Sequence, residues 1–160
     1  MIKVFENLFV GNDEDCNSMM NEGWAVIHAC KIHCHQKAVS YKGNLKSTHP
    51  NYLIYERYNH LFLNMVDMEQ ELLPLYTNPI MKAAMSFIDK HISDKKVLIH
   101  CNQGISRSPS IALLYLARIE KIANDTFNNA VIDFKKKYPL YNPGKGILMY
   151  MNKNWRTIIK

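Results

Sequence analysis

The sequence predicts an α/β fold: a single domain over residues 1–160 in which a central, twisted, mostly parallel sheet is flanked by helices. Short apolar runs rich in β-branched residues alternate with longer segments whose apolar residues recur at helical spacing, an order typical of parallel α/β sheets. The chain has 160 residues, of which 48% are hydrophobic, so it can bury roughly 70% of its unfolded surface in one domain. The pattern contains no internal repeat.

The N-terminal part predicts a strand pair, a helix and another strand. Residues 2–10 carry apolar side chains on both sides of a polar centre, which predicts two strands joined by a tight turn. Helix-starting side chains at 12–15 predict a short helix over Cys16–Glu22, and Gly23 ends it. The apolar run Trp24–Ala29 predicts the next strand.

The middle of the chain predicts three more strands and an amphipathic helix. Two runs, Asn51–Arg57 and His60–Val66, flank a turn at Tyr58-Asn59. A helix is expected to start at Thr77-Asn78-Pro79, because proline is tolerated in a first turn and apolar residues at helical spacing follow. Val97–Ile99 is short and wholly apolar, which predicts a buried strand.

The C-terminal part predicts three helices. The segment Ile111–Ala117 is apolar on nearly all sides, so we expect a helix buried in the middle of the domain. Asn124-Asp125 is expected to cap a further helix that ends near the lysines at 135–137. Turn-forming residues over 138–146 then lead to an amphipathic helix over 147–159.

Composition narrows the class of protein. The net charge of +6 favours anionic substrates, although a solvated basic surface explains it equally well. The four cysteines form no disulfide framework, so we expect reduced thiols. No apolar run approaches the length of a membrane span and the N-terminus has no signal-peptide core, so we expect a cytoplasmic protein without membrane contact.

A cluster of potential metal ligands follows the Trp24–Ala29 strand. Five such side chains fall within eight residues: His28, Cys30, His33, Cys34 and His35. Zinc sites usually combine two groups of ligands separated by a loop, but only His49 and His60 follow nearby. We therefore favour a strand end and loop without metal. Residues 36–51 are interpreted as a plain surface loop rather than a substrate-specificity insertion.

The segment between Val97–Ile99 and the buried helix has the composition of an anion-binding loop. It reads Cys-x5-Arg-Ser, from Cys101 to Ser108, with Gly104 in the middle. A loop folded back at a helix N-terminus directs several backbone N–H groups at one point, where a phosphate-sized dianion binds. Gly104 allows the tight backbone turn, and the Arg107 guanidinium fits two phosphate oxygens.

This loop also predicts nucleophilic chemistry. The positive field favours the thiolate form of Cys101, and a thiolate below a bound phosphate can attack phosphorus to form a covalent intermediate. The Ser108 hydroxyl is placed to bond the sulfur and help it leave. The backbone amides of the intervening residues are the expected phosphate donors: Asn102, Gln103, Gly104, Ile105 and Ser106.

The stretch His100-Cys101, with Arg107-Ser108 after it, resembles the signature of the cysteine-dependent protein tyrosine phosphatases. The ending Gly104 to Ser108 is similar to that of the dual-specificity branch. The resemblance implies a protein tyrosine phosphatase-like fold and phosphomonoester hydrolysis through a cysteinyl-phosphate, with no cofactor and no metal for the chemistry. Gln103 departs from the family's usual small alanine.

Asp67 is the expected general acid. The leaving oxygen needs a proton, and the family carries an aspartate on a loop upstream of its Cys-x5-Arg loop. Asp67 follows the run His60–Val66, which fits that position; Glu69 and Glu71 are the rivals. After the leaving group departs, the same carboxylate is expected to act as general base on the hydrolytic water.

The resemblance implies a phosphorylated protein or peptide as substrate. The chain has little room for the recognition loop that deepens the pocket of tyrosine-only enzymes, so phosphoserine and phosphothreonine are expected beside phosphotyrosine. RNA 5′-phosphatase and phosphoinositide phosphatase activities are the alternatives, and the lack of lysine in the loop weakens the second. A silent phosphate-binding module and a rhodanese-like or arsenate-reducing enzyme fit less well, because Asp67 and His100 are present.

Overall fold

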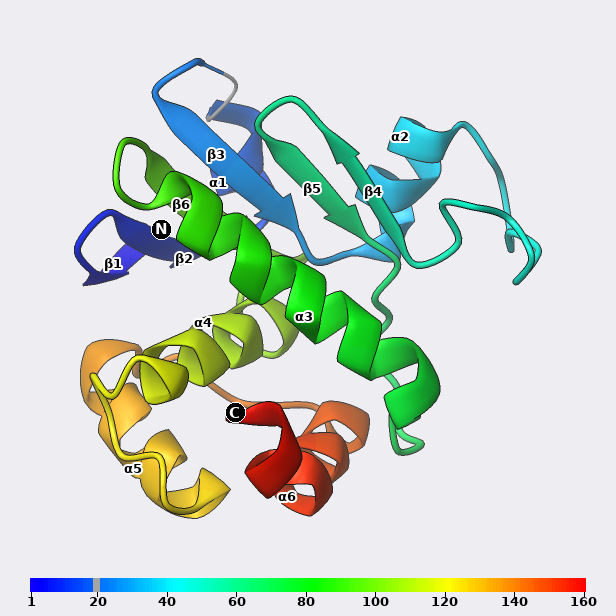
Figure 1. Cartoon of the computed structure of the whole chain (residues 1–160). Helices are drawn as coiled ribbons and strands as arrows, with labels where there is room; N and C mark the ends of the chain where they lie inside the picture. The colour runs from blue at the N-terminus through cyan, green and yellow to red at the C-terminus, as the bar shows by residue number, and fades with distance from the viewer. Residues whose placement is uncertain (19–20) are drawn as a thin grey trace.

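The computed structural model describes residues 1–18 and 21–160, and within them one six-stranded sheet forms the centre of the molecule (Figure 1). The strand order is β1-β2-β6-β3-β5-β4. The bounds are β1 Ile2–Phe5, β2 Leu8–Gly11, β3 Trp24–His28, β4 Ile54–Arg57, β5 His60–Leu63 and β6 Lys96–His100.

The four inner strands are parallel, and only the two edge strands run antiparallel to their neighbours. β6 lies between β2 and β3, with Ile99 opposite both Val10 and Ile27. Val97, Leu98 and Ile99 are fully buried, as expected for a parallel strand covered on both faces. The predicted mostly parallel α/β sheet is confirmed.

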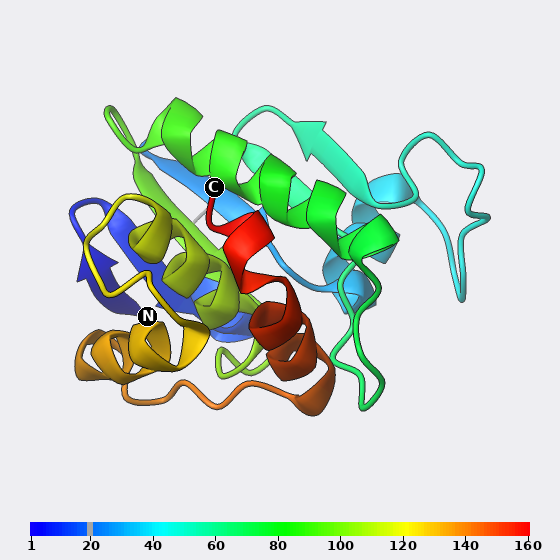
Figure 2. The same ribbon diagram turned by 60° about the horizontal axis from the view of Figure 1, so that its bottom comes forward.

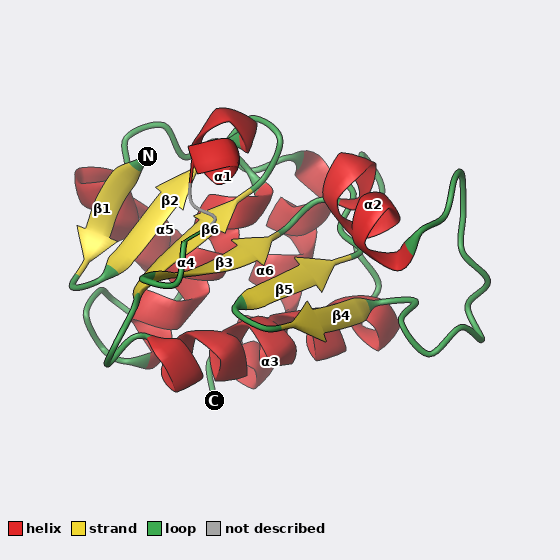
Figure 3. Cartoon of the chain, turned by 90° about the horizontal axis from the view of Figure 1, so that it is seen from above, coloured by secondary structure: helices red, strands yellow, loops and turns green. Residues whose placement is uncertain are grey.

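Helices cover both faces of this sheet. The bounds are α1 Asp13–Ser18, η1 Lys31–His35, α2 Gln36–Val39, α3 Pro74–His91, α4 Arg107–Arg118, α5 Phe127–Lys137 and α6 Lys145–Ile158. Figure 3 shows α3 to α6 behind the sheet, with α1 and α2 on the near side.

The candidate loop begins directly after β6 ends at His100. It therefore lies at the carboxyl ends of the parallel strands, where open α/β sheets bind their ligands.

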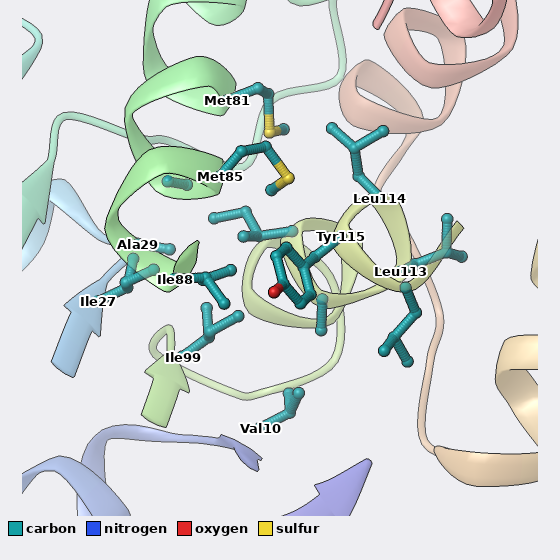
Figure 4. Packing of buried hydrophobic residues seen from close by; sticks show 14 of the residues in the cluster. Val10, Ile27, Ala29, Met81, Met85, Ile88, Ile99, Leu113, Leu114 and Tyr115 are labelled. Carbon is teal, nitrogen blue, oxygen red and sulfur yellow. The ribbon is translucent and has the colours of Figure 1, made fainter. Parts of the chain in front are cut away.

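α4 is the buried helix that the sequence predicts. It contacts β2 and β6 as well as three helices, and Figure 2 shows it surrounded by α3, α5 and α6. Figure 4 shows Leu114 and Tyr115 of α4 on the side of Met81, Met85 and Ile88 of α3, with the strand residues Val10, Ile27 and Ile99 nearby, while Leu113 lies on the other side of α4. This packing fixes the N-terminus of α4 beside the end of β6.

The first predicted helix has the wrong bounds. The helix predicted over Cys16–Glu22 begins at Asp13 instead, because the Asn12 side chain accepts bonds from the backbone N–H groups of Glu14 and Asp15, at 3.0 and 3.3 Å. Residues 19–20 of that prediction lie outside the described part of the chain, and residues 21–23 form a bend and turn.

The hairpin strands are shorter than predicted. β4 starts at Ile54, because residues 49–53 form a turn closed by Tyr52 N–H donating to the His49 carbonyl at 3.0 Å. β5 ends at Leu63, and the Met65 carbonyl accepts instead from the Lys31 backbone N–H at 3.0 Å. The loop predicted over 36–51 is correct except for the short helix α2.

Two helix starts also differ from prediction. α3 begins at Pro74 rather than at Thr77, so Pro79 lies inside it and leaves the carbonyl of Leu75, an exposed residue, without a helical partner. α5 is capped by Thr126, whose hydroxyl accepts from the Asn129 N–H at 3.1 Å. Among the helices described, none has the length and apolarity needed to span a membrane.

Candidate active site

The loop over residues 101–106 joins β6 to α4 and folds tightly against β2. The Cys101 backbone N–H donates to the Gly11 carbonyl at 3.4 Å, and the Tyr138 hydroxyl donates to the Gly104 carbonyl at 2.6 Å. Gly104 has φ +72°, and a Cβ there would lie 2.9 Å from the Gly11 oxygen. Only glycine fits this turn, as the sequence predicts.

The Cys101 sulfur lies beside the Ser108 hydroxyl. Sγ and Oγ are 3.2 Å apart, and Oγ is also 3.2 Å from the Gly11 carbonyl oxygen. Both side chains are buried. A hydroxyl has one hydrogen, so Ser108 donates either to Gly11 or to the sulfur, and a thiolate would draw that hydrogen toward itself.

Arg107 is buried and held at two points. Its Nη1 donates to the Met65 carbonyl at 3.0 Å, and its Nη2 donates to Asn102 Oδ1 at 2.7 Å. Its Nε has no hydrogen-bond partner among the residues that the structure describes. A fixed guanidinium with a buried, unpartnered N–H fits an anionic ligand at this loop.

Asn102 has a role that sequence reasoning missed. The prediction used only its backbone N–H, but its side-chain Nδ2 also donates to Asp13 Oδ2 at 2.9 Å and to the Ile32 carbonyl at 2.7 Å. Asn102 therefore connects Arg107 with α1 and η1. No local sequence signal indicates Asp13 or Ile32, because both come from segments far away along the chain.

Asp67 lies against the loop, whereas its rival Glu71 is paired elsewhere. Ser106 Oγ donates to Asp67 Oδ1 at 3.2 Å and accepts from the Gly144 N–H at 2.8 Å. A Cβ on Gly144 would lie too close to the Asp67 carboxylate, so a side chain there would displace it from Ser106. Glu71 instead pairs with Lys153 at 3.3 Å. Sequence reasoning did not identify Gly144.

The carbonyl groups of the remaining loop residues accept hydrogen bonds from neighbouring segments. Gln103 is exposed, and the Ile105 carbonyl accepts from the Asn142 N–H at 2.8 Å. The Ser106 carbonyl accepts from both the backbone and the hydroxyl of Ser110. The carbonyls of Gly104, Ile105 and Ser106 thus all accept hydrogen bonds from other parts of the protein, and the amide groups of the loop are the donors that a ligand can use.

Three buried or half-buried histidines lie behind the loop. His28 Nδ1 is 2.7 Å from His100 Nε2, and His28 Nε2 is 3.0 Å from His60 Nδ1. Burial, followed by the neighbouring His100 and His60, lowers the pKa of His28 to about 2, so this imidazole is neutral.

Only part of the predicted ligand cluster gathers here. Cys34 Sγ lies 3.8 Å from His100 Nε2, and Cys16 Sγ lies 3.5 Å from His28 Nδ1. His35 points elsewhere, toward the Tyr41 hydroxyl at 2.7 Å and the Asn51 carbonyl at 2.9 Å. His33 is exposed.

A groove of about 310 Å³ lies beside the Asp67 segment. Its lining comes from the 44–53 loop, the chain after β5 and the start of α3, and includes Tyr52, Met68, Leu73 and Tyr76. Most of the lining side chains are apolar, so the groove suits an apolar group of a bound molecule.

Comparison with protein families gives a match over most of the chain. Residues 25–153 match the family described as the dual specificity phosphatase catalytic domain. The match includes Asp67 and the whole Cys101 to Ser108 loop.

Two curated proteins are similar in sequence. The dual specificity protein phosphatase YVH1 of Plasmodium falciparum (isolate 3D7) is 36% identical over 101 residues, which is 60% of this chain and 16% of that protein. The tyrosine-protein phosphatase vhp-1 of Caenorhabditis elegans is 32% identical over 119 residues, 73% of this chain and 17% of that protein. The chain thus spans about a sixth of the length of these relatives.

Solved structures share the fold. The crystal structure of the human tyrosine phosphatase-like serine/threonine/tyrosine-interacting protein matches with a TM-score of 0.66 at 19% identity, covering 100% of this chain and 98% of that one.

Proposed function

Because the chain belongs to the family of dual specificity phosphatase catalytic domains, we propose that it hydrolyses phosphomonoesters on phosphorylated proteins through a cysteinyl-phosphate. The observation that carries this proposal is the position of Arg107. Its guanidinium is buried and tied to Met65 and Asn102, at the far end of the loop that begins at Cys101. The proposed nucleophile, the Cys101 sulfur, and the proposed phosphate-binding group, the Arg107 guanidinium, thus belong to the same rigid loop.

Binding of the phosphoryl group is the first task of this loop. The backbone N–H groups of 102–106 and the N-terminus of α4 attract the dianion, and the fixed Arg107 fork bonds two of its oxygens. Because burial of α4 holds these donors in place, little reorganisation accompanies the reaction.

Transfer to sulfur is the second task. The Cys101 thiolate forms the S–P bond as the P–O bond to the leaving group breaks, and Asp67 gives its proton to the departing oxygen. Asp67 is exposed and bonded to Ser106, so it is positioned by the loop and open to substrate.

Hydrolysis completes the cycle. Asp67, now a carboxylate, takes a proton from water as the water oxygen bonds phosphorus and the S–P bond breaks. The Ser108 hydroxyl turns from the Gly11 carbonyl to the sulfur and stabilises the returning thiolate. Inorganic phosphate leaves, and Asp67 is again protonated.

We infer a substrate class that includes phosphoserine and phosphothreonine beside phosphotyrosine. The exposure of residues 66–70, which include Asp67, supports a shallow entrance that short side chains can use. The groove of about 310 Å³ beside Asp67 receives flanking peptide residues.

A substrate panel tests the proposal. Purified protein is assayed for phosphate release from phosphotyrosine, phosphoserine and phosphothreonine peptides, phosphoinositides and 5′-triphosphate RNA, with Cys101→Ser as the inactive control. We expect release from the peptides, lost in the variant. Release from RNA or phosphoinositides alone, or equal activity of Cys101→Ser, would overturn the proposal.

A further inference from the structure

We propose that this chain binds one structural zinc ion, held tetrahedrally by Cys16 Sγ, His28 Nδ1, Cys34 Sγ and His100 Nε2. These four atoms lie within 4.8 Å of one another. We call this group the Cys16/His28/Cys34/His100 cluster. It lies behind the candidate catalytic loop and supplies none of its reacting groups.

The interatomic distances fit a zinc ion. Zinc bonds histidine nitrogen at about 2.0–2.1 Å and cysteine sulfur at about 2.3 Å, so tetrahedral ligands lie about 3.3–3.8 Å apart. The two sulfur–nitrogen distances, 3.5 Å from Cys16 Sγ to His28 Nδ1 and 3.8 Å from Cys34 Sγ to His100 Nε2, fall in this range. The two imidazole nitrogens, now 2.7 Å apart, need to separate by only about 0.6 Å to admit the ion.

The fold, rather than the sequence order, brings the ligands together. His28 and His100 are paired in register at the ends of the neighbouring parallel strands β3 and β6. α1 supplies Cys16, and η1 supplies Cys34. The imidazoles are buried while both sulfurs are half-buried, which gives a metal ion a route to the cluster.

Outer contacts orient both imidazoles. His28 Nε2 meets His60 Nδ1 at 3.0 Å, so His28 directs Nδ1 at the cluster. His100 Nδ1 has no hydrogen-bond partner among the described residues and lies 3.4 Å from Asp13 Oδ1, which leaves Nε2 facing the cluster. Metal-binding histidines typically have their second nitrogen held by such a partner, often a carboxylate.

The donor set selects zinc among common divalent ions. Two thiolates and two neutral imidazoles balance the charge of Zn²⁺ and suit its tetrahedral preference, whereas Mg²⁺ and Ca²⁺ require oxygen ligands. On binding, each of the two thiols forms a Zn–S bond and releases its proton to solvent.

A second group shares two of the ligands: Asp13, Cys30, Cys34 and His100. We favour the first group because Asp13 Oδ2 already accepts from Asn102, and because Cys30 is fully buried. The first group also has His60 to orient His28. The first group uses Cys16 and His28 where the second uses Cys30 and Asp13, so cysteine variants can distinguish the two groups.

Metal analysis of the tag-free protein tests the proposal. Wild type, Cys16→Ser, Cys34→Ser, Cys30→Ser and Cys101→Ser are dialysed against metal-free buffer, and zinc per chain is measured by mass spectrometry. We expect one zinc ion in wild type, Cys30→Ser and Cys101→Ser. In Cys16→Ser and Cys34→Ser, competition with a chromogenic chelator should show zinc binding weakened by more than about tenfold.

Spectroscopy on the wild-type protein tests the same cluster without relying on variants, whose misfolding could also abolish zinc binding. Zinc-edge X-ray absorption should report two sulfur and two nitrogen ligands, and cobalt substitution should give intense tetrahedral bands with thiolate-to-metal charge transfer. A wild-type protein without bound zinc, octahedral cobalt spectra, or zinc retained by Cys16→Ser but lost by Cys30→Ser would each overturn the proposed cluster.

Discussion

At the scale of single residues, Asn102 connects the candidate site with α1 and η1. Its side-chain oxygen accepts a hydrogen bond from Arg107, and its side-chain nitrogen donates to Asp13 and to the Ile32 carbonyl. The side chain is half-buried, so its removal leaves the core intact. Its contribution is to hold the guanidinium in the orientation that phosphate requires.

Asn102→Ala tests this positioning role. We expect kcat/KM for an aryl phosphate to fall about 10- to 100-fold, mainly through KM, because the fork loses one of its two tethers. Asn129→Ala, on the exposed face of α5, is the matched control and should leave kcat/KM unchanged. Steady-state kinetics measure both, and an unaltered KM in Asn102→Ala would contradict the role.

Asp67→Asn tests the general acid. We expect kcat to fall about 10²- to 10⁴-fold for phenyl phosphate, which has a poor leaving group, and much less for an activated nitro- or fluoro-substituted aryl phosphate. The fall in kcat that accompanies deprotonation of the acid with rising pH should also vanish. Glu69→Gln is the control; if it reproduces this leaving-group dependence and Asp67→Asn does not, the wrong carboxylate has been chosen.

Ser108→Ala tests the return of the thiolate. The hydroxyl stabilises sulfur as it leaves phosphorus, and loss of a hydrogen bond to a charged group is worth about 1.5–3 kcal/mol, or roughly 10- to 100-fold in rate. We expect slow breakdown of the intermediate, seen as a burst of leaving group in stopped-flow measurements. If the burst and the steady-state rate were both reduced, Ser108 would act in formation of the intermediate instead.

At the scale of elements, the β6–loop–α4 unit depends on the conformation of Gly104. Its φ of +72° disfavours a side chain, and a Cβ there would lie only 2.9 Å from the Gly11 carbonyl oxygen. Gly43 also has a positive φ, +66°, but nothing lies within 4 Å of where its Cβ would be. A comparison of alanine substitutions at Gly104 and Gly43 therefore separates the effect of steric collision from that of backbone strain.

Gly104→Ala should therefore destabilise more than Gly43→Ala. Each pays about 1–2 kcal/mol for the left-handed conformation, and the collision at position 104 adds to this. Urea denaturation should show a larger loss of unfolding free energy for Gly104→Ala, together with loss of activity. Equal losses in the two variants would contradict the close packing of loop and β2.

The elements that sequence reasoning located well are those with strong local signals. Val97–Ile99 and the all-apolar segment Ile111–Ala117 appear as β6 and α4, because burial on every side leaves a continuous apolar run. The boundaries that it missed depend on long-range contacts. β5 ends early because Met65 bonds Lys31 and Arg107, and neither partner is visible from the local pattern.

At the scale of the whole molecule, the candidate site could be predicted where one segment supplies it. Cys101, Gly104, Arg107 and Ser108 lie within eight residues, so their spacing, together with the strand before them and the helix after them, indicated an anion loop. The Cys16/His28/Cys34/His100 cluster could not be predicted this way. The sequence argument against zinc looked for a second ligand group near His28–His35, whereas the fold brings Cys16 and His100 from α1 and β6.

The central claim is a covalent bond between phosphorus and the Cys101 sulfur, and trapping that bond tests it most directly. Protein mixed with a phosphopeptide is quenched in acid within the burst phase, and intact-mass and peptide mass spectrometry locate any added phosphoryl group. The account predicts one phosphoryl group on Cys101, absent from Cys101→Ser. Turnover of the phosphopeptide with the phosphoryl group on another residue would contradict it.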